Sequence, residues 1–336
     1  MATINSLSIA ARATLNLHSL NNEGGEGNQI QTRMVDVVDD SGAMHTVNAI
    51  SGDMMRHVVA EHLLRVALSR SLPLSEGARR LDANRINADL KRNAKDSGVE
   101  LPKSDPEALD FILRYCAVTD MLGTLITEGN RSLPRKSVLE FGWVVGVPDR
   151  VRTESYFHVK YSADRGSAQR KQDADDAESA GANRGQAIFH RPASSGIYAI
   201  VCHLELARIG YNDLTQRYAI EPEARLARAQ SLIDALLYTF LELNGAMRAA
   251  QLPHLTAISG LISSSSGIVP APLISPLAGG AENGESYRTQ ARGIAAALDG
   301  QNGSAVAAIP FESLEGFTVA MRAHSQDLQL ADLTRL

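Results

Sequence analysis

Cysteine is scarce in this sequence, and its scarcity excludes two kinds of covalent or metal stabilisation. The 336 residues include two cysteines, Cys116 and Cys202, each among apolar neighbours. Disulfide frameworks and structural zinc sites need clusters of cysteine or histidine at short spacings, and the sequence has none. Isolated cysteines are typical of proteins in a reducing compartment. We therefore expect the chain to fold through an ordinary hydrophobic core.

Targeting and membrane-spanning segments are also missing from the sequence. Residues 1–6 show no charged stretch leading into an apolar core, which a signal peptide would need. No apolar run approaches the length of a membrane span. We expect a cytoplasmic protein that does not associate with a membrane.

Signatures of catalysis are absent as well. The sequence has no Walker loop, no G-x-S-x-G elbow and no H-E-x-x-H pair. His57 and His62 are five residues apart, so they would not share a helix face as a metal-binding i, i+4 pair does. The residues therefore assign no catalytic group, no metal ligand and no cofactor.

Positive charge is concentrated locally, although the net charge is −5. This balance excludes a uniformly basic nucleic-acid binder but is compatible with a basic groove. Basic side chains outnumber acidic ones in residues 79–95 and again in residues 131–136. Because charge runs are most often solvated helix faces, composition alone leaves both interpretations open.

The hydrophobic pattern of the first 70 residues predicts strand, loop, strand and helix. Apolar and polar side chains alternate over residues 3–18, as in a half-buried strand. A loop rich in glycine and amides follows at 21–29, then a strand at 30–38 and a turn at 39–42. Residues 51–69 have the apolar spacing of an amphipathic helix.

The remainder of the chain mixes both kinds of element, so we predict an α+β fold. Residues 71–135 are mostly helical, and 223–247 form a second long amphipathic helix. Further strands are expected at 138–147, 156–161, 187–190, 196–207 and 254–262, with a serine-rich loop at 263–270 and short elements at 287–298 and 310–324. The polar segment 162–187 lacks the apolar residues needed to order itself, and we predict a mobile hairpin tip there.

The start of the helix at residue 51 is a candidate anion site. Ser51 or Asp53 can cap the helix, whose free N–H groups and dipole favour an anion such as phosphate. Gly52 permits a tight turn, and Arg56 and His57 add side-chain donors one turn inside. An ordinary capped helix with no ligand explains the same residues.

Other donors and stacking groups are spread over several loops and strands, as backbone recognition of RNA requires. Amides come from the first loop, cations from the basic segment, an aromatic ring and a cation from the hairpin, and a hydroxyl from the serine loop. The candidate residues are Asn22, Gln29, Arg135, Lys136, Phe189, Arg191 and Ser264.

Two segments together resemble a known family. The strand leading into the loop Leu20–Gln29, followed by Val47–His57, is similar to the DevR-type backbone subunit of type I CRISPR Cascade complexes. The resemblance implies a modified RNA-recognition, or ferredoxin-like, palm made of residues 1–70 and 136–336. It also implies helical fingers at 71–135 and a long β-hairpin thumb at 160–190.

The resemblance further implies a function. A protein of this family would bind guide crRNA, stack on copies of itself, assemble with other Cascade subunits and present the guide for pairing with target DNA. Ser51, Gly52 and Arg56 match the turn that holds guide phosphates, Asn22 and Gln29 match the first loop, and Phe189 is the residue assigned to the thumb. RNA-cleaving relatives carry an aspartate in the first loop; Glu23 and Glu26 stand here instead, which disfavours cleavage.

Two other functions remain open at this stage. One is a metal-independent endoribonuclease of the same superfamily with His18 or His57 as general base. The other is a protein-only interaction scaffold that binds no nucleic acid.

Overall fold

A computed structural model describes residues 2–92, 98–161, 186–278 and 286–335. Its helices are α1 (Gly52–Ser69), α2 (Glu76–Arg79), α3 (Ile86–Arg92), α4 (Asp105–Tyr115), α5 (Ala117–Leu122), α7 (Pro222–Leu241), α8 (Ser286–Leu298) and α9 (Leu314–Gln326). Its strands are β1 (Ala2–Ile4), β2 (Ser6–His18), β3 (Asn22–Glu26), β4 (Gln29–Thr32), β5 (Met34–Val38), β6 (Met44–Ile50), β7 (Thr124–Ile126), β8 (Leu133–Arg135), β9 (Leu139–Phe141), β10 (Val144–Tyr161), β11 (Gln186–Leu204), β12 (Tyr211–Asn212), β13 (Arg217–Tyr218), β14 (His254–Ser265), β15 (Val306–Phe311) and β16 (Leu328–Leu330).

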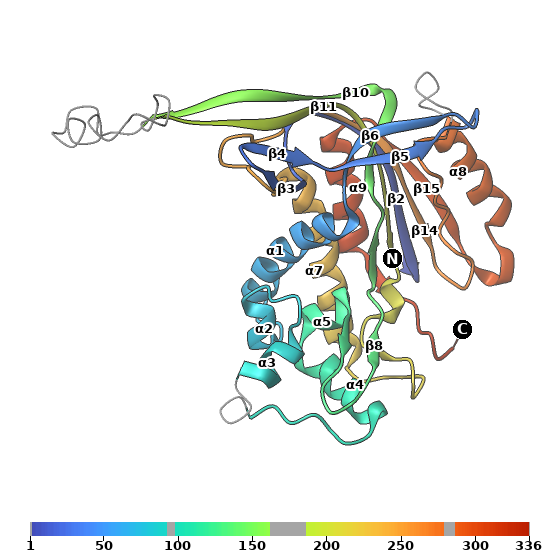
Figure 1. Cartoon of the computed structure of the whole chain (residues 1–336). Coiled ribbons are helices and arrows are strands. Elements are labelled where there is room, and N and C mark those ends of the chain that lie inside the picture. Colours follow the sequence, from blue (N-terminus) through green and yellow to red (C-terminus); the bar gives the residue numbers. More distant parts are fainter. Residues whose placement is uncertain (1, 93–97, 162–185, 279–285, 336) are drawn as a thin grey trace, which may run out of the picture.

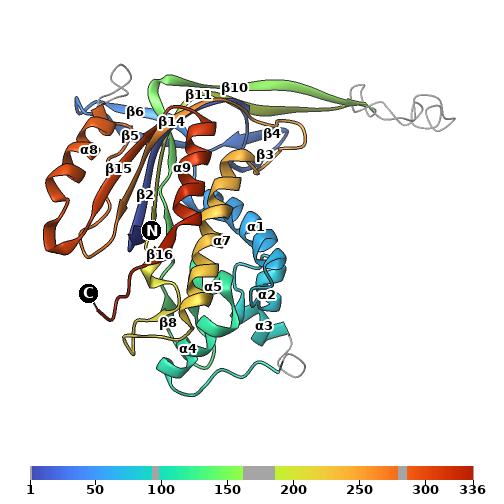
Figure 2. The ribbon, with the colours of Figure 1, turned by 180° about the vertical axis from the view of Figure 1, so that it is seen from behind.

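The main sheet runs in the order β15-β14-β2-β11-β10-β6-β5, with neighbours antiparallel along this path. Helices α1, α7 and α9 cover one face of the sheet (Figures 1 and 2). Leu7 and Ile9 of β2 are fully buried in that helical core. Ser6 and Ser8, on the other side of the strand, are buried too. The expected mixture of helix and sheet is confirmed, but β2 is buried on both faces rather than on one.

The segment 71–135 shares the core of the rest of the chain. Leu109 and Ile112 of α4 and Met121 of α5 belong to the same hydrophobic cluster as Leu63 of α1 and Leu236 of α7. In Figure 1 these helices lie below α1, next to the lower end of α7. The segment also contains the short β7–β8 hairpin, whose residues were predicted as part of a mostly helical region.

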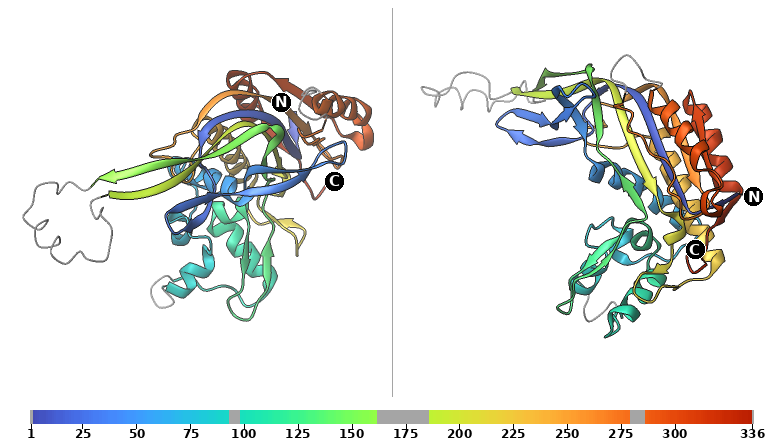
Figure 3. Two further views of the ribbon diagram at one scale, coloured as in Figure 1. Left: turned by 45° about the horizontal axis from the view of Figure 1, so that its top comes forward. Right: turned by 90° about the vertical axis from the view of Figure 1, so that its right-hand side faces the viewer.

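Strands β10 and β11 form one long hairpin that extends away from the body (Figures 1 and 3). Their pairing continues from Val145 opposite Ala199 out to Tyr161 opposite Gln186. The sequence analysis treated 138–147 and 156–161 as separate strands, as it did 187–190 and 196–207. Between these segments β10 carries mostly polar residues that are exposed or half-buried, whereas Ala193 and Ser194 on β11 are buried. The hydrophobic pattern therefore weakens although the pairing continues. Residues 162–185 of the predicted mobile tip at 162–187 lie outside the described residues.

Three further predictions of local structure were wrong. The loop at 21–29 contains β3 and the start of β4, and strand β6 was missed altogether. The helix predicted to reach Met247 ends at Leu241, because the chain beyond it turns so that Ala246 N–H donates to the Leu20 carbonyl at 3.1 Å. The first residues of the serine loop, Ser263–Ser265, belong to β14.

A buried carboxylate joins four segments of this fold. Asp120 on α5 accepts hydrogen bonds at 2.7 Å from Arg135 at the end of β8 and at 2.7 Å from Arg228 on α7. The backbone N–H of Gly210 donates to its Oδ2 at 3.0 Å. All three side chains are essentially inaccessible to solvent. The negative charge of Asp120 thus offsets two buried guanidinium groups.

We predict that Asp120→Asn lowers the free energy of unfolding by about 3–5 kcal/mol, because it leaves the buried Arg228 guanidinium without its counter-charge and Arg135 with only the partly exposed Asp213, 3.5 Å away. Urea unfolding followed by circular dichroism measures the change. Asp40→Asn, at an exposed position, is the control and should change stability by less than about 0.5 kcal/mol. Equal stabilities of the two variants would contradict the structural role of Asp120.

Candidate functional site

The first turn of α1 lies against β9 at very close range. The Ser51 Oγ accepts a hydrogen bond from the Met54 N–H at 3.1 Å, as an N-cap does, and the Ser51 N–H donates to the Asn21 Oδ1 at 2.7 Å. A Cβ at Gly52 would lie 2.3 Å from the Phe141 carbonyl oxygen. Only glycine therefore lets the helix begin here. The predicted Ser51 cap is present, and Gly52 serves the close approach to β9.

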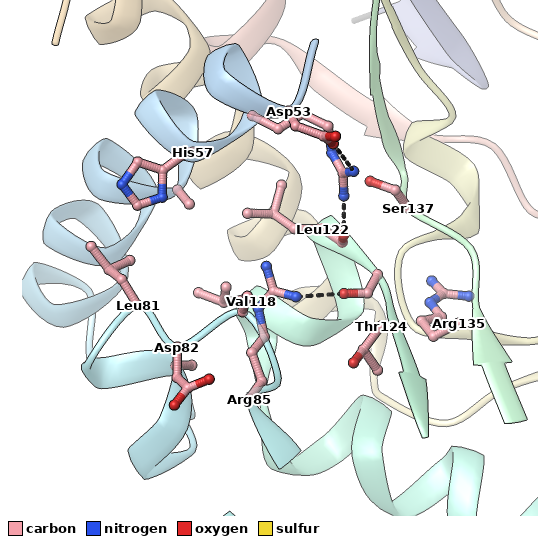
Figure 4. A pocket seen from close by; sticks show the side chains of 15 residues that line it. Asp53, His57, Leu81, Asp82, Arg85, Val118, Leu122, Thr124, Arg135 and Ser137 are labelled. Carbon is pink, nitrogen blue, oxygen red and sulfur yellow. Dashed lines mark hydrogen bonds and ion pairs between the residues drawn. The ribbon is translucent and has the colours of Figure 1, made fainter. Parts of the chain in front are cut away.

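Two adjoining cavities lie beside the N-terminal part of α1. Together they form a groove, which we call the α1 groove. The larger cavity, of about 560 Å³, is bounded by α1, the segment 78–85, the end of α5 and Ser137 (Figure 4). The smaller, of about 310 Å³, extends past Ser51 and Phe141 to Trp143. Asp53, Arg56 and Ser137 belong to both cavities, so the groove is continuous.

Two guanidinium groups in the α1 groove are held by neutral carbonyl groups at the end of α5. Arg56 Nη2 donates to the Leu122 carbonyl at 2.6 Å, and Arg85 Nη1 donates to the Gly123 carbonyl at 2.7 Å. A helix C-terminus favours cations because its last carbonyls lack intrahelical partners. The arrangement orients both side chains without neutralising their charge.

The electrostatics of the groove favour an anion. Burial lowers the pKa of Arg85, and the nearby positive charge of Arg56 lowers this pKa further. An arginine side chain stays protonated in proteins, so the two cations remain close together. The exposed carboxylate of Asp53 is 3.6 Å from Arg56 Nη1, and the half-exposed His57 is 3.4 Å from Glu61. An incoming anion would relieve the repulsion between the two guanidinium groups.

Arg85 and Asn21 are site residues that the sequence analysis did not select. Arg85 was grouped with a charge run, and only its hydrogen bond to Gly123 shows that it turns into the groove. Asn21 lies next to the selected Asn22, whose Oδ1 instead accepts from Ser19 Oγ at 2.6 Å. Gln29 is exposed on β4, opposite His190 of the hairpin. Nothing in the sequence shows which of the adjacent residues Asn21 and Asn22 contacts the start of α1.

Arg135 has a different role from the one predicted. Its backbone borders the α1 groove, but its guanidinium is fully buried with Asp120 and donates to the carbonyls of Arg208 at 2.7 Å and Tyr211 at 2.9 Å. These contacts occupy the guanidinium hydrogen-bond donors of Arg135 inside the protein, so this side chain does not face a ligand. Lys136 is exposed and lies 2.9 Å from Glu140 and 3.0 Å from Glu205. Its hydrogen bond to Glu140 raises the pKa of its ammonium group.

Aromatic rings gather on the described arms of the hairpin. Phe189 stacks on His158 with ring centroids 5.6 Å apart, and the Arg191 guanidinium lies 4.5 Å from the centre of the Phe189 ring. Phe157, on the facing strand, is more exposed and packs edge-on against His190. Phe189 and Arg191 are thus brought together as a pair. Phe157 was not selected from the sequence, because alternation along a strand does not show which aromatic ring is covered by its neighbours.

Ser264 does not share the site of the other candidates. It lies on β14 opposite Leu7 of β2, whereas the hairpin leaves the sheet near His18, eleven residues further along β2. At about 3.3 Å per strand residue, the two ends of β2 are more than about 30 Å apart. The predicted serine loop is strand at this point, so the hydroxyl is not presented by a loop.

The two histidines considered as general bases differ in their access to solvent. His18 is buried beside Tyr198, and burial lowers the pKa of its imidazole to about 4. It therefore has no contact with a substrate in solution. His57 borders the α1 groove and is half exposed. Among the described residues, no group of three or more histidine, cysteine or acidic side chains is placed to hold a metal ion.

None of the helices in the described part of the chain is both long and apolar enough to cross a membrane.

Comparison with known proteins identifies the family. The model of the family described as CRISPR-associated negative auto-regulator DevR/Csa2 matches residues 9–283. The chain belongs to the DevR/Csa2 family. The resemblance on Leu20–Gln29 and Val47–His57 is thereby confirmed, and the matched region of this DevR/Csa2 member includes the α1 groove.

Individual relatives of this DevR/Csa2 member are distant. CRISPR-associated protein Cas7/Csa2 1 of Saccharolobus solfataricus is 25% identical over 271 residues, which are 77% of this chain and 79% of the relative. A chain of a CRISPR RNA-guided surveillance complex, pre-nicking, is 12% identical with a TM-score of 0.46, covering 85% of this chain and 89% of that one. A chain of another CRISPR RNA-guided surveillance complex is 11% identical with a TM-score of 0.42, covering 85% and 84%.

The depressed pKa of His18 predicts a specific loss of stability in acid. The unfolded imidazole, with a pKa near 6.5, takes up a proton before the folded one does, so this contribution is lost as the pH falls from 6.5 toward 4. We expect His18 to account for about 2 kcal/mol of the stability lost between pH 8 and pH 5. Urea unfolding of wild type and His18→Phe at both pH values should show a smaller loss in the variant. His254→Asn, at an exposed histidine, should behave as wild type; the same loss in all three proteins would refute the assignment.

Proposed function

We propose that this protein is a non-catalytic, guide-RNA-binding backbone subunit of a type I CRISPR Cascade complex, in the cytoplasm. The observation that carries the proposal is the α1 groove of a DevR/Csa2 family member, where the Leu122 and Gly123 carbonyls orient the Arg56 and Arg85 guanidinium groups in one cavity, beside the carboxylates of Asp53 and Asp82. The partners in this proposal are crRNA, copies of the same chain, other Cascade subunits and target DNA paired to the guide.

The proposed mechanism is recognition of the RNA backbone. The N–H groups of Gly52 and Asp53 precede the first hydrogen bond of α1, whereas the Met54 N–H is taken by the Ser51 cap. The dipole of the helix favours a negative charge beside them. A guide phosphate in the groove would meet these N–H groups and the Arg56 and Arg85 guanidinium groups, which form strong charge-assisted hydrogen bonds with phosphate. Contacts of this kind position RNA without reading its bases, so Watson–Crick pairing supplies the specificity for target DNA.

The connectivity of the sheet supports a ferredoxin-like palm. The elements β2, α1, β10, β11, α7 and β14 follow one another in the β-α-β-β-α-β pattern, and their strands lie in the order β14-β2-β11-β10. Contacts between α1 and α7 are consistent with two helices on one face. In this proposal residues 1–70 and 136–336 are the palm and 71–135 the fingers. The hairpin of β10 and β11, around 160–190, is the thumb that displaces guide bases.

Replacement of Arg56 tests the phosphate groove. We expect Arg56→Glu, purified after co-expression with a CRISPR array, to retain at least ten-fold less RNA than wild type, because a charged donor becomes a repelling carboxylate. Extracted RNA is quantified and sized, and the assembly is examined by size exclusion with and without ribonuclease. The matched control is Arg65→Glu, an exposed arginine of the same helix outside the groove. Arg56→Gln, which introduces no negative charge, should show an intermediate loss.

Three outcomes would count against the proposal. Equal RNA content in Arg56→Glu and Arg65→Glu would remove the groove from guide binding. A wild-type protein that carries no RNA after co-expression with the CRISPR array would favour a protein-only scaffold. Cleavage of a repeat RNA without added metal, lost in His57→Ala, would favour an endoribonuclease.

A further inference from the structure

Trp143 is a large aromatic side chain held at the surface by a fixed backbone. It is the one tryptophan of the chain and is 43% exposed. Before it, the Gly142 N–H donates to the Val201 carbonyl at 2.9 Å; after it, Val144 pairs with Ile50 of β6. Strand pairing on both sides leaves the residue little freedom to turn inward. An indole kept in contact with water on a rigid element is typical of a binding surface.

The indole of Trp143 is oriented by a cation. The Arg33 guanidinium lies 5.5 Å from the centre of its ring, within the range of a cation–π contact. Arg33 is itself fixed, because its Nε is 2.6 Å from Glu23 and its carbonyl accepts from Asn48 Nδ2 at 2.9 Å and from Ala49 N–H at 3.0 Å. The ring is therefore positioned before any ligand arrives, which lowers the entropy cost of binding.

The cavity that Trp143 borders has the size for one nucleobase, and its charged lining consists of Arg56 and the carboxylates of Asp53 and Glu140. Its volume of about 310 Å³ is at the lower end of the roughly 300–1,000 Å³ of small-molecule sites. Arg56, on its wall, also lines the larger cavity. The carboxylate of Glu140, in the same cavity, lies 2.9 Å from Lys136 Nζ, which offsets its repulsion of an anionic ligand.

We propose that the indole of Trp143 stacks on one base of the bound RNA while the adjoining part of the α1 groove holds a neighbouring phosphate. This inference rests on the proposed function and adds to it a base contact that is independent of sequence, since every base has a π-face. The geometry that carries it is a pre-oriented aromatic ring in a cavity continuous with a groove that gathers two arginines.

A fluorescence experiment tests the stacking directly, because no other tryptophan contributes to the signal. The full-length protein is titrated with a 12-nucleotide oligoadenylate and with a ribose–phosphate oligomer of equal length that lacks bases. We expect the oligoadenylate to quench the tryptophan emission and the abasic oligomer to bind without quenching. Fluorescence anisotropy of a fluorescein-labelled oligoadenylate should show about 5- to 150-fold weaker binding by Trp143→Ala and a smaller loss by Trp143→Phe.

Controls separate failure of this inference from failure of the proposed function. Tyr238→Ala, at an exposed aromatic outside the α1 groove, should bind the oligoadenylate as wild type does. Thermal unfolding checks that each variant is folded. The stacking proposal would be overturned if Trp143→Ala bound the oligoadenylate with wild-type affinity and the oligoadenylate did not quench the emission of the wild-type protein. The phosphate groove would then remain intact. No binding of either oligomer by the wild-type protein would overturn the proposed function itself.

Discussion

The carboxylate of Asp120 joins the parts of the chain on which the site is built. It draws together Arg135 at the end of β8, Arg228 on α7 and the backbone at Gly210, so it fixes α5 against three separate segments. The carbonyl end of α5, two and three residues further on, then holds the guanidinium groups of Arg56 and Arg85. A buried ion pair is costly to form, but once formed it is strongly destabilising to break. The groove depends on this network because its cations are oriented by a helix that the network anchors.

Local charge, and not net charge, determines what the α1 groove can bind. The chain carries a net charge of −5, yet two arginines meet in one cavity beside the terminus of a helix. Their hydrogen bonds go to carbonyl oxygens, which carry partial charges only. Arg135, which also lines the larger cavity, is bonded to the buried carboxylate of Asp120 instead. The carbonyl partners thus distinguish Arg56 and Arg85 from Arg135, whose guanidinium is paired with a buried carboxylate.

Prediction from the sequence was most successful where local patterns decide the structure. The alternation over residues 3–18 and the helical spacing from residue 51 follow from side-chain periodicity, and both elements are present. Ser51 acts as the cap because the first turn of the helix imposes that requirement, whereas the need for glycine at position 52 comes from the Phe141 carbonyl of the distant strand β9. Prediction failed for Arg135 and Ser264, whose surroundings are set by segments distant in the chain, and for the continuity of β10 through its polar stretch.

The sequence by itself determined the mixed helix and sheet content, the capped start of α1 and, through the segments 20–29 and 47–57, the family. These properties depend on residues close together in the chain, where spacing and side-chain type suffice. Only the tertiary structure decided which arginines are oriented in the α1 groove and which are buried with Asp120. Arg56 and Arg85 are brought together by α5, and Trp143 is aligned by Arg33 from more than a hundred residues earlier. Such contacts depend on how distant segments pack, and no local pattern in the chain encodes the position of a partner that far away.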